Sequence, residues 1–499
     1  MDSAHGQTSH FVRVDAYPRP VGVPAYRWLY DTVKQQILDG RLTPGARLPG
    51  TRDIAAHYGL SRGTIVSAFE QLTQEGYLEG SVGSGTYVSK SLPQEPLNAE
   101  RAGDSVETLA QRRNLSPYAR QVKPFFHLDP RAPRSFRPHL PAMDLFPIGQ
   151  WAQIAARRIR SYTVTQMVGC DAMGYGPLRE AIANYLRTAR GVRCEAHQVV
   201  IVSGTQEALD IISRLYLNAN DRVAMEDPGY PGAARVFESH GAQVCPIPVD
   251  EDGMAFTPAL LRGARLAYVT PAHQFPTGVA MSLSRRLDLL EWARTNHALV
   301  FEDDYDSEYR YSGRPIPALQ GLDRHGVVIH AASFSKVLFP SLRLGYFVVP
   351  PDMVDQVAAA KGVTMRHAPL LEQLVLAEFI AEGHFARHIR RMRDVYSERL
   401  GILAENARSH LSGLLDLSTI EAGLQTIGWL RPGLAEADAC AAAQARGIEV
   451  TPLGRYTRGP VRRNGLMLGF AAIDANEIRR GTIELAMALE GAQRRLAVA

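Results

Sequence analysis

The chain has 499 residues, of which 45% are hydrophobic, and 55 lysines and arginines stand against 51 aspartates and glutamates. This length exceeds one compact domain, and the apolar content is ample for a large core. A net charge of +4 is too small for a chain of this size to identify a partner. Four scattered cysteines, with neither a metal-ligand nor a redox spacing, exclude a disulfide scaffold, and no metal site is predicted.

No segment predicts export or membrane insertion. Residues 1–10 are polar and lack an apolar core, and no run approaches the ~18 to 20 apolar residues that a membrane span requires. We therefore expect a cytoplasmic protein without a membrane partner.

The N-terminal segment predicts three short helices. Apolar residues recur at helical spacing between residues 24 and 39, at Tyr26, Leu29, Tyr30, Val33 and Ile37. After a break that contains glycine and proline, Thr51 is expected to cap a second helix with the apolar residues Ile54, Ala55 and Tyr58. A turn at Gly59 precedes Ser61, which is expected to cap a third helix whose buried face is Ile65, Ala68, Phe69 and Leu72.

Polar residues face outward where the third helix starts, namely Arg62, Gly63, Thr64 and Ser67. A helix, a turn and a second helix in this arrangement place such side chains on base edges in the major groove of DNA. Residues 76–88 follow as two short strands around a glycine-rich tip, the form of a wing that approaches the DNA backbone or minor groove. A bare helix-turn-helix pattern can equally be a packing motif.

The whole stretch resembles the GntR-type winged helix, including the run Pro44-Gly45-Ala46-Arg47-Leu48-Pro49 and the ending Gly83-Ser84-Gly85-Thr86-Tyr87-Val88. The resemblance implies that double-stranded operator DNA is contacted by Arg47, Arg52, Ser61, Arg62 and Thr64, with Gly85 at the wing tip. Residues 1–90 carry nine Lys+Arg against eight Asp+Glu, so the positive surface must be local. We assign residues 18–90 to this domain.

Residues 91–137 predict a linker, because they have few periodic apolar residues and contain Pro93, Pro96, Pro117, Pro124, Pro130 and Pro133. Such a segment is expected to be a semi-extended, partly mobile tether. Its charges at Arg112, Arg113 and residues 131–137 either contact DNA phosphates or are solvated linker charge, and we expect the second.

Strands alternating with helices through residues 180–350 predict a mostly parallel sheet covered by helices on both faces. A long helical pattern from Leu371 to about Ala407 then leads to a smaller α+β portion, with strands expected near residues 425–430, 448–451 and 466–470. We assign residues 138–499 to this second domain.

Three polar groups stand at the ends of apolar runs in this domain. Residues 199–202 read as a buried strand, and Ser203-Gly204-Thr205-Gln206 turns it into a helix whose first N–H groups point at an anion. Residues 299–301 deliver the acidic cluster Glu302, Asp303, Asp304 and Asp306 at a strand's carboxyl end, and Lys336 follows a third run. Taken singly, each has an ordinary explanation. An amine, an anion cradle and a carboxylate together are what pyridoxal phosphate (PLP) requires.

These residues resemble the fold-type I aminotransferases from roughly Pro138 to the C-terminus. The resemblance to the MocR/GabR-type transcriptional regulators is closer still, and it is carried by four segments in the same order: residues 226–232, 270–278, 302–311 and 333–345. The fold class implied is a multidomain protein, with an N-terminal winged helix-turn-helix and an α/β fold-type I PLP-dependent aminotransferase-like domain ending in a small α+β subdomain.

The resemblance implies a role for each matching residue. Lys336 would form the internal aldimine with PLP, Asp303 would bond the pyridinium nitrogen, and Tyr305 would bond the phenolic oxygen. Tyr230 would stack on the ring. Arg343 would pair with the phosphate through its fork of donors, aided by Gly204, Thr205, Gln206, Ser333 and Ser335.

Three positions depart from the family pattern. Met467 stands where many relatives use an arginine for the substrate carboxylate, so Arg455 is the expected effector-binding arginine, with Arg458, Arg462 and Arg463 as neighbours. Gly169 stands where relatives have a tyrosine that reaches the phosphate of the neighbouring subunit, which puts that contact in doubt. His273 or Gln274 lies where related enzymes use an asparagine, but the spacing differs.

The leading hypothesis is a PLP-dependent transcriptional regulator that senses an amino compound, or PLP itself, at Lys336. The resemblance implies a head-to-tail homodimer whose two heads read two half-sites. The alternative is a catalytically active aminotransferase that carries a DNA-binding domain. A third possibility is a DNA-binding protein whose cofactor is only structural. We expect a sensing role with at most weak transaminase activity.

Overall fold

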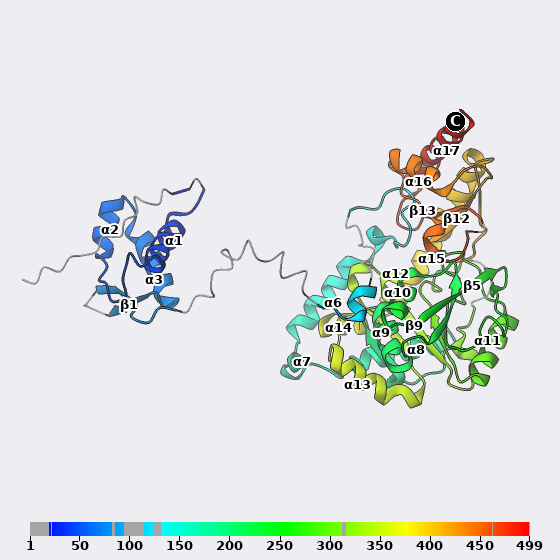
Figure 1. Cartoon of the computed structure of the whole chain (residues 1–499), viewed down its shortest axis with the longest axis horizontal. Helices are drawn as coiled ribbons and strands as arrows, with labels where there is room; N and C mark the ends of the chain where they lie inside the picture. Colours follow the sequence, from blue (N-terminus) through cyan, green and yellow to red (C-terminus); the bar gives the residue numbers. More distant parts are fainter. Residues whose placement is uncertain are drawn as a thin grey trace, which may run out of the picture. The chain divides into compact units, whose positions relative to one another are not determined.

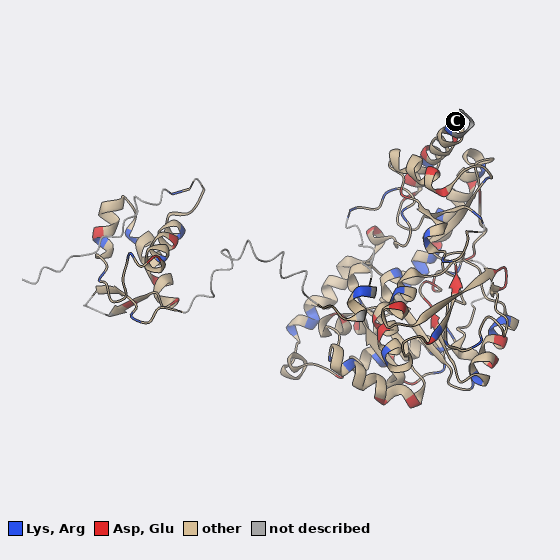
Figure 2. Ribbon diagram, viewed as in Figure 1, with Lys and Arg blue, Asp and Glu red and all other residues tan. Residues whose placement is uncertain are grey.

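The computed structural model describes residues 19–20, 22–81, 85–93, 114–122, 131–311, 316–461 and 463–498. The chain divides into two compact units, Met1–Asn114 and Leu115–Ala499 (Figure 1). Arg112, Arg113 and Arg462 lie outside the described residues. Acidic and basic residues are interspersed on the helices of both units, in keeping with the small net charge (Figure 2).

The first unit is a three-helix core with a two-stranded wing. Its elements are α1 (Ala25–Leu38), α2 (Thr51–Tyr58), α3 (Arg62–Gln74), β1 (Leu78–Ser81) and β2 (Gly85–Val88). The two strands are antiparallel, with Leu78 opposite Val88. The predicted apolar faces of α1 and α3 are buried in one core, except for Tyr26, which is 43% exposed.

The ends of these helices follow local chemistry. Ser61 caps α3 as predicted, because its Oγ accepts a hydrogen bond of 3.1 Å from the Thr64 N–H. The prediction that Thr51 caps α2 is wrong, since Gly50 is the extended residue before the helix and Thr51 is already its first helical residue. Gly59 ends α2 at φ 63°, a left-handed conformation that favours glycine.

The second unit is built on an eight-stranded sheet of order β3-β10-β9-β8-β7-β4-β5-β6. Strands β4, β5, β7, β8 and β9 pair in parallel, as predicted, whereas β10 and β6 enter antiparallel. The strands are β3 (Val199–Val202), β4 (Arg222–Asp227), β5 (Gln243–Asp250), β6 (Gly253–Met254), β7 (Ala264–Val269), β8 (Leu299–Asp303), β9 (Val328–Ser333) and β10 (Gly345–Val348).

Helices cover both faces of this sheet, as the alternating pattern predicted (Figure 1). In β3, Val200 and Val202 join the core under α9, α10 and α13, whereas Val199 and Ile201 join the opposite core. The helices are α5 (Pro117–Gln121), α6 (Ile148–Arg160), α7 (Val164–Val168), α8 (Gly176–Ala189), α9 (Thr205–Tyr216), α10 (Pro231–Ser239), α11 (Leu283–Thr295), α12 (Phe334–Val337), α13 (Val354–Thr364) and α14 (Leu370–Ala381).

A smaller α+β subdomain follows, with a four-stranded antiparallel sheet of order β11-β12-β14-β13. The single long helix predicted here is two, because Gly383 takes a φ of 74° between α14 and α15. The strands predicted near residues 425–430 and 466–470 appear as β12 and β14, whereas the one predicted near residues 448–451 is displaced to the two-residue β13; β11 was not predicted. The elements are α15 (His384–His410), β11 (Leu415–Leu417), β12 (Gln425–Leu430), α16 (Glu436–Ala445), β13 (Thr451–Pro452), β14 (Gly465–Gly469) and α17 (Ala475–Val498).

Residues 131–137, predicted as linker, pack into the second unit. Phe136 is fully buried and forms an antiparallel bridge with Gly469. The fit is close, because a Cβ on Gly469 would stand 2.1 Å from the Arg137 carbonyl oxygen. This segment therefore reaches the edge of the smaller sheet, where it contributes to the site described below.

Two negative findings bear on function. None of the described helices is long and apolar enough to cross a membrane. Within the same part of the chain, no group of three or more His, Cys, Asp or Glu side chains is placed to hold a metal ion.

The start of α9 depends on a buried ion pair. Lys361 of α13 is fully buried, and its Nζ lies 2.7 Å from Glu207 Oε1. The other carboxylate oxygen of Glu207 accepts the Ser203 N–H at 2.7 Å, so the pair holds the turn between β3 and α9.

We predict that Lys361→Ala lowers the free energy of unfolding by about 3 to 5 kcal/mol, because it leaves the Glu207 carboxylate unpaired. The double variant Glu207→Gln/Lys361→Met, which removes both charges, should recover most of the loss. Chemical denaturation followed by tryptophan fluorescence measures both. Equal destabilisation by the single and double variants would contradict this account.

Candidate cofactor site and nucleic-acid interface

A cavity of about 450 Å³ opens where the carboxyl ends of the parallel strands meet the smaller subdomain. Every residue that the sequence assigns to the cofactor or effector lines it: Gly204, Thr205, Gln206, Tyr230, Asp303, Tyr305, Ser333, Ser335, Lys336, Arg343 and Arg455. Ligands of open α/β sheets bind at this edge. The structure thus brings together side chains that are up to 251 positions apart in the sequence.

Lys336 lies on α12, directly after β9. Its Nζ donates a hydrogen bond of 2.8 Å to the carbonyl oxygen of His139. Burial lowers the pKa of Lys336 to about 8, against the opposing pull of the Asp306 and Asp303 carboxylates. The amine therefore loses its proton far more readily than an exposed lysine, as a nucleophile for an aldehyde must.

An anion cradle lies at the start of α9. Gly204 precedes the helix at φ 142°, and a Cβ there would stand 3.8 Å from the Arg343 guanidinium. Ser333 Oγ accepts the Ser335 N–H at 3.2 Å, whereas Ser335 Oγ is buried with no hydrogen-bond partner among the described groups. Helix N–H groups, a guanidinium and an unpaired hydroxyl fit the phosphate of PLP.

The acidic side chains at the end of β8 point in alternating directions, so only some of them face the cavity. Glu302 and Asp304 face away from the cavity, where Glu302 pairs with His330 at 3.0 Å and Asp304 pairs with Arg190 at 2.8 Å. Asp303 faces the cavity and accepts the Tyr268 hydroxyl at 2.7 Å. Burial raises the pKa of Asp303 to about 7. A carboxylate held this way fits the protonated ring nitrogen of PLP.

Tyr230 lies across the start of α10. Its hydroxyl is 3.2 Å from Gln206 Nε2, and the ring occupies space that only a glycine at 232 leaves open, since a Cβ there would be 2.4 Å from Tyr230 Cζ. The aromatic ring is thereby held as one wall of the cavity.

The residues that depart from the family pattern can be located in the structure, and their surroundings are as follows. Met467 is fully buried in an apolar cluster and does not line the cavity. A side chain at Gly169 would meet His367, because a Cβ there would be 2.7 Å from its Nε2. Neither His273 nor Gln274 lines the cavity. Gln274 instead donates hydrogen bonds to the carbonyl oxygens of Pro228 and Phe275.

Sequence reasoning missed several residues that line the cavity, among them Arg137, His139, Tyr268, Thr270, Gln425 and Glu449. Arg137 pairs with Glu449 at 3.4 Å, and His139 Nε2 lies 2.8 Å from the Tyr456 hydroxyl. Burial lowers the pKa of His139 well below its ordinary value, so its ring is neutral. Two of them carried a signal, since Tyr268 lies in an apolar run that reads as a strand and Thr270 begins one of the four segments that resemble the family.

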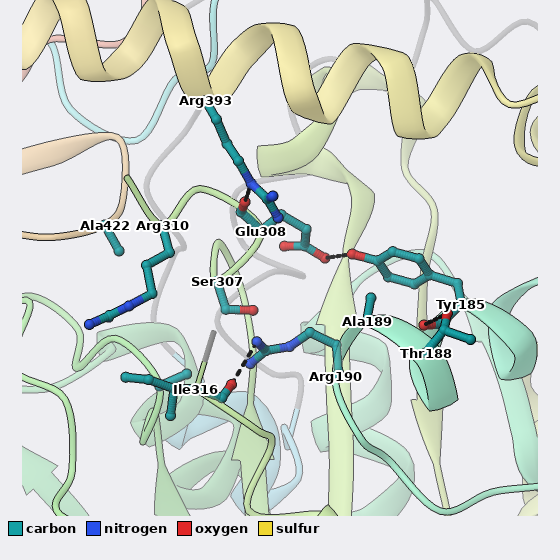
Figure 3. A pocket seen from close by; sticks show the side chains of 11 residues that line it. Tyr185, Thr188, Ala189, Arg190, Ser307, Glu308, Arg310, Ile316, Arg393 and Ala422 are labelled. Carbon is teal, nitrogen blue, oxygen red and sulfur yellow. Dashed lines mark hydrogen bonds between the residues drawn. The ribbon is translucent and has the colours of Figure 1, made fainter. Parts of the chain in front are cut away.

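A second cavity, of about 380 Å³, lies on the other side of the chain that follows β8 (Figure 3). It is lined by polar residues from several elements: Tyr185, Arg190, Ser307, Glu308, Arg310 and Arg393. Burial raises the pKa of Glu308 to about 7, and its carboxylate accepts the Tyr185 hydroxyl at 3.2 Å. Asp306 lines the first cavity and Ser307 the second, so this short segment separates the two.

The predicted DNA contacts lie on the first unit. Arg52 and Arg62 are exposed at the starts of α2 and α3. The Thr64 hydroxyl is 2.8 Å from Ser61 Oγ, so both side chains belong to the helix cap. A Cβ on Gly85 would lie 3.2 Å from Arg47 Nε, which places this guanidinium beside the wing. Gly85, which was predicted to lie at the wing tip, is the first residue of β2, and residues 82–84 before it lie outside the described residues.

A winged helix joined to an aminotransferase-like fold with a complete cofactor cavity defines a PLP-dependent transcriptional regulator. Residues 25–88 match the bacterial regulatory proteins of the gntR family, and residues 152–457 match aminotransferase class I and II. The chain is 39% identical to the probable rhizopine catabolism regulatory protein MocR of Rhizobium meliloti, over 93% of each chain. It belongs to the MocR-type regulators of the GntR family, and its cofactor is pyridoxal phosphate.

Two further similarities support this placement. The chain is 30% identical to the pyridoxine biosynthesis transcriptional regulator PdxR of Corynebacterium glutamicum, over 92% of this chain and 94% of that one. The structure matches α-aminoadipate aminotransferase LysN of Thermus thermophilus, solved with N-(5'-phosphopyridoxyl)-L-leucine, with a TM-score of 0.67 and 29% identity. That match covers 73% of this chain and 93% of LysN.

The pKa of Lys336 gives a testable pH dependence. Only the unprotonated amine attacks the cofactor's aldehyde, so we predict that the rate of PLP attachment to cofactor-free protein rises with pH and levels off above about pH 8. Stopped-flow absorbance measures this rate, with butylamine as the reference amine of ordinary pKa. A rate that still climbs tenfold per pH unit above pH 9 would show that Lys336 has an ordinary pKa.

Proposed function

We propose that the second unit senses an amino compound, or PLP itself, at Lys336, and that binding there changes how the winged helix engages operator DNA. The observation that carries this proposal is the single cavity that holds a partly buried lysine of lowered pKa, an anion cradle and a carboxylate, in a chain that also has a DNA-binding domain. PLP supplies a reactive aldehyde and an electron-accepting ring.

We assign the cofactor-holding roles as the sequence predicted them. Lys336 provides the amine, and Asp303 keeps a proton on the ring nitrogen. The phosphate is held by Arg343 and by smaller groups around the start of α9: Gly204, Thr205, Gln206, Ser333 and Ser335. The unpartnered hydroxyl of Ser335 and the guanidinium beside Gly204 support this assignment. Thr205 also contacts Asp303 at 3.5 Å, so it links the two ends of the site.

Arg455 is proposed to bind the carboxylate or another anionic group of the effector. It lines the cavity, whereas the described neighbouring arginines, Arg458 and Arg463, do not. The backbone N–H of Arg458 donates to Asp227 at 2.7 Å and its guanidinium pairs with Glu238, and Arg463 lies over the Trp429 ring at 4.8 Å. These engagements support Arg455 as the arginine that takes over from the missing one at Met467.

The proposed assembly is a head-to-tail homodimer that acts in the cytoplasm on two DNA half-sites. The head-to-tail arrangement is what the similarity to the MocR-type regulators implies, and two heads are expected because one winged helix covers a single half-site.

The visible absorption spectrum of the purified protein tests the sensing role. We predict a cofactor band that is absent in Lys336→Ala and that shifts and persists when one amino compound is added without an oxo acid. If the band instead bleaches and returns when an oxo acid is added, the protein is a working aminotransferase with a DNA-binding domain. A band that no amino compound alters would contradict sensing of amines at this site.

The DNA-binding role has its own test. Arg62→Ala should weaken binding to a selected operator by about tenfold or more, because a guanidinium at the start of the recognition helix contributes roughly 1 to 3 kcal/mol when it reads a base. Arg27→Ala on α1 removes the same charge and is the matched control, since Arg27 pairs with Asp31 at 3.4 Å. Fluorescence anisotropy with labelled DNA measures both. Equal losses would mean that Arg62 contributes only general charge.

A further inference from the structure

Tyr305 contacts the buried His273, which in turn contacts the buried Asp306, and neither residue belongs to the proposed set of cofactor-binding residues. The Tyr305 hydroxyl lies 3.0 Å from His273 Nδ1, and the same nitrogen lies 2.8 Å from Asp306 Oδ1. The His273 and Asp306 side chains are 5% and 1% exposed. Since His273 does not line the cavity, it can act on a bound cofactor only through the cavity residues that it contacts, Tyr305 and Asp306.

The proton on His273 can be located from its surroundings. His273 Nε2 is buried with no hydrogen-bond partner among the described groups. A hydrogen there would be an unpaired buried donor, which is costly, whereas a hydrogen on Nδ1 finds the Asp306 carboxylate. The carboxylate therefore fixes the Nδ1–H tautomer, as carboxylate partners of histidine commonly do.

This tautomer decides where the Tyr305 hydrogen points. Because Nδ1 is a donor, the Tyr305 oxygen meets an N–H and cannot give its own hydrogen to His273. Burial raises the pKa of Tyr305 well above its ordinary value, so the hydroxyl keeps its proton. The Tyr305 O–H is thus left to donate on its other side, into the cavity that Tyr305 lines.

The histidine ring is also held in place by its neighbours. It stacks on the Tyr305 ring with a centroid distance of 5.8 Å. On its other side the chain comes so close that a Cβ on Gly423 would stand 2.2 Å from His273 Cε1. The Gly423 N–H donates to the Tyr309 carbonyl oxygen at 2.9 Å, which fixes that approach. Because the ring is confined in this way, its Nδ1 stays within hydrogen-bonding distance of Tyr305 and Asp306.

We propose that His273 and Asp306 are positioning residues that aim the Tyr305 hydroxyl at the phenolic oxygen of PLP and so set the pKa of the Lys336–cofactor chromophore. The inference rests on the role proposed for Tyr305. A hydroxyl that donates to the phenolic oxygen draws negative charge from it and weakens its hold on the neighbouring proton. Loss of that donor therefore raises the pKa of the chromophore.

The test is a pH titration of the visible band in holo-protein. Tyr305→Phe should raise the pKa of the chromophore by about 1, the tenfold effect expected for one lost hydrogen bond. His273→Phe keeps an aromatic ring and should raise it in the same direction, and the double variant should go no further. Asp306→Asn frees the histidine tautomer but also removes a carboxylate that raises the pKa of Lys336, so His273→Phe is the deciding variant. The other titratable or charged groups of the cavity stay in place: Asp303, His139, Tyr230, Tyr268, Tyr456, Arg343, Arg455, Arg137 and Glu449.

His240→Phe is the matched control. His240 Nε2 lies 2.8 Å from Asp210, in a histidine–aspartate pair that does not line the cavity, and its loss should leave the chromophore unchanged. If Tyr305→Phe raises the pKa of the chromophore but His273→Phe leaves it unchanged, the positioning role is overturned while the site stands. If Tyr305→Phe itself has no effect, or if the band survives in Lys336→Ala, the proposed site fails and the inference falls with it.

Discussion

The site depends on the amine of Lys336, which must be neutral to react although Asp303 and Asp306 nearby favour its protonated form. Asp303 and Asp306 both raise the pKa of Lys336, but burial outweighs them and leaves it at about 8. The same burial raises the pKa of Asp303 to about 7, so the attraction between the two groups is kept small. On the side away from the cavity, Glu302 pairs with His330, whose pKa the carboxylates raise against the effect of burial, and Asp304 pairs with Arg190. Alternation along β8 is what separates these two sets of acids.

A regulator of this kind must convert chemistry in one unit into a change in another. The first unit has its own core, and none of its described residues lines the cofactor cavity. The proposed sensing requires two arrangements of the second unit with different affinities for effector, commonly separated by about 1 to 3 kcal/mol of coupling. Residues of both the large sheet and the smaller subdomain line the cofactor cavity. A movement of the subdomain relative to the sheet would therefore change the cavity, and this movement is the conformational change that the proposal favours.

Local pattern was enough to predict much of the fold and the site. The runs that end at Gly204, Asp303 and Lys336 are apolar, β-branched and short, and parallel strands bring such ends to one edge of a sheet. The cap at Ser61 and the turn at Gly59 were predictable for the same reason, since their chemistry is confined to a few residues. What each cavity residue does remains a prediction that the proposed experiments address.

Contacts between distant segments could not be read from the sequence. Arg137 and His139 come from a stretch without periodicity, and their place in the cavity depends on the packing of Phe136 against the smaller sheet. The cap predicted at Thr51 was wrong because Gly50 already has the extended conformation that a cap requires. The break at Gly383 was missed because the apolar pattern runs on through it. The link from Asp306 through His273 to Tyr305 joins residues 33 positions apart and has no local signature.

The most direct test of the central claim is to reduce the bond between Lys336 and PLP with borohydride in the wild-type protein and then to measure operator affinity with and without effector. The account predicts that the reduced protein still binds its operator but no longer responds to an amino compound, because the lysine can no longer leave the cofactor. A reduced protein that responds as before would show that the chemistry at Lys336 is not the signal.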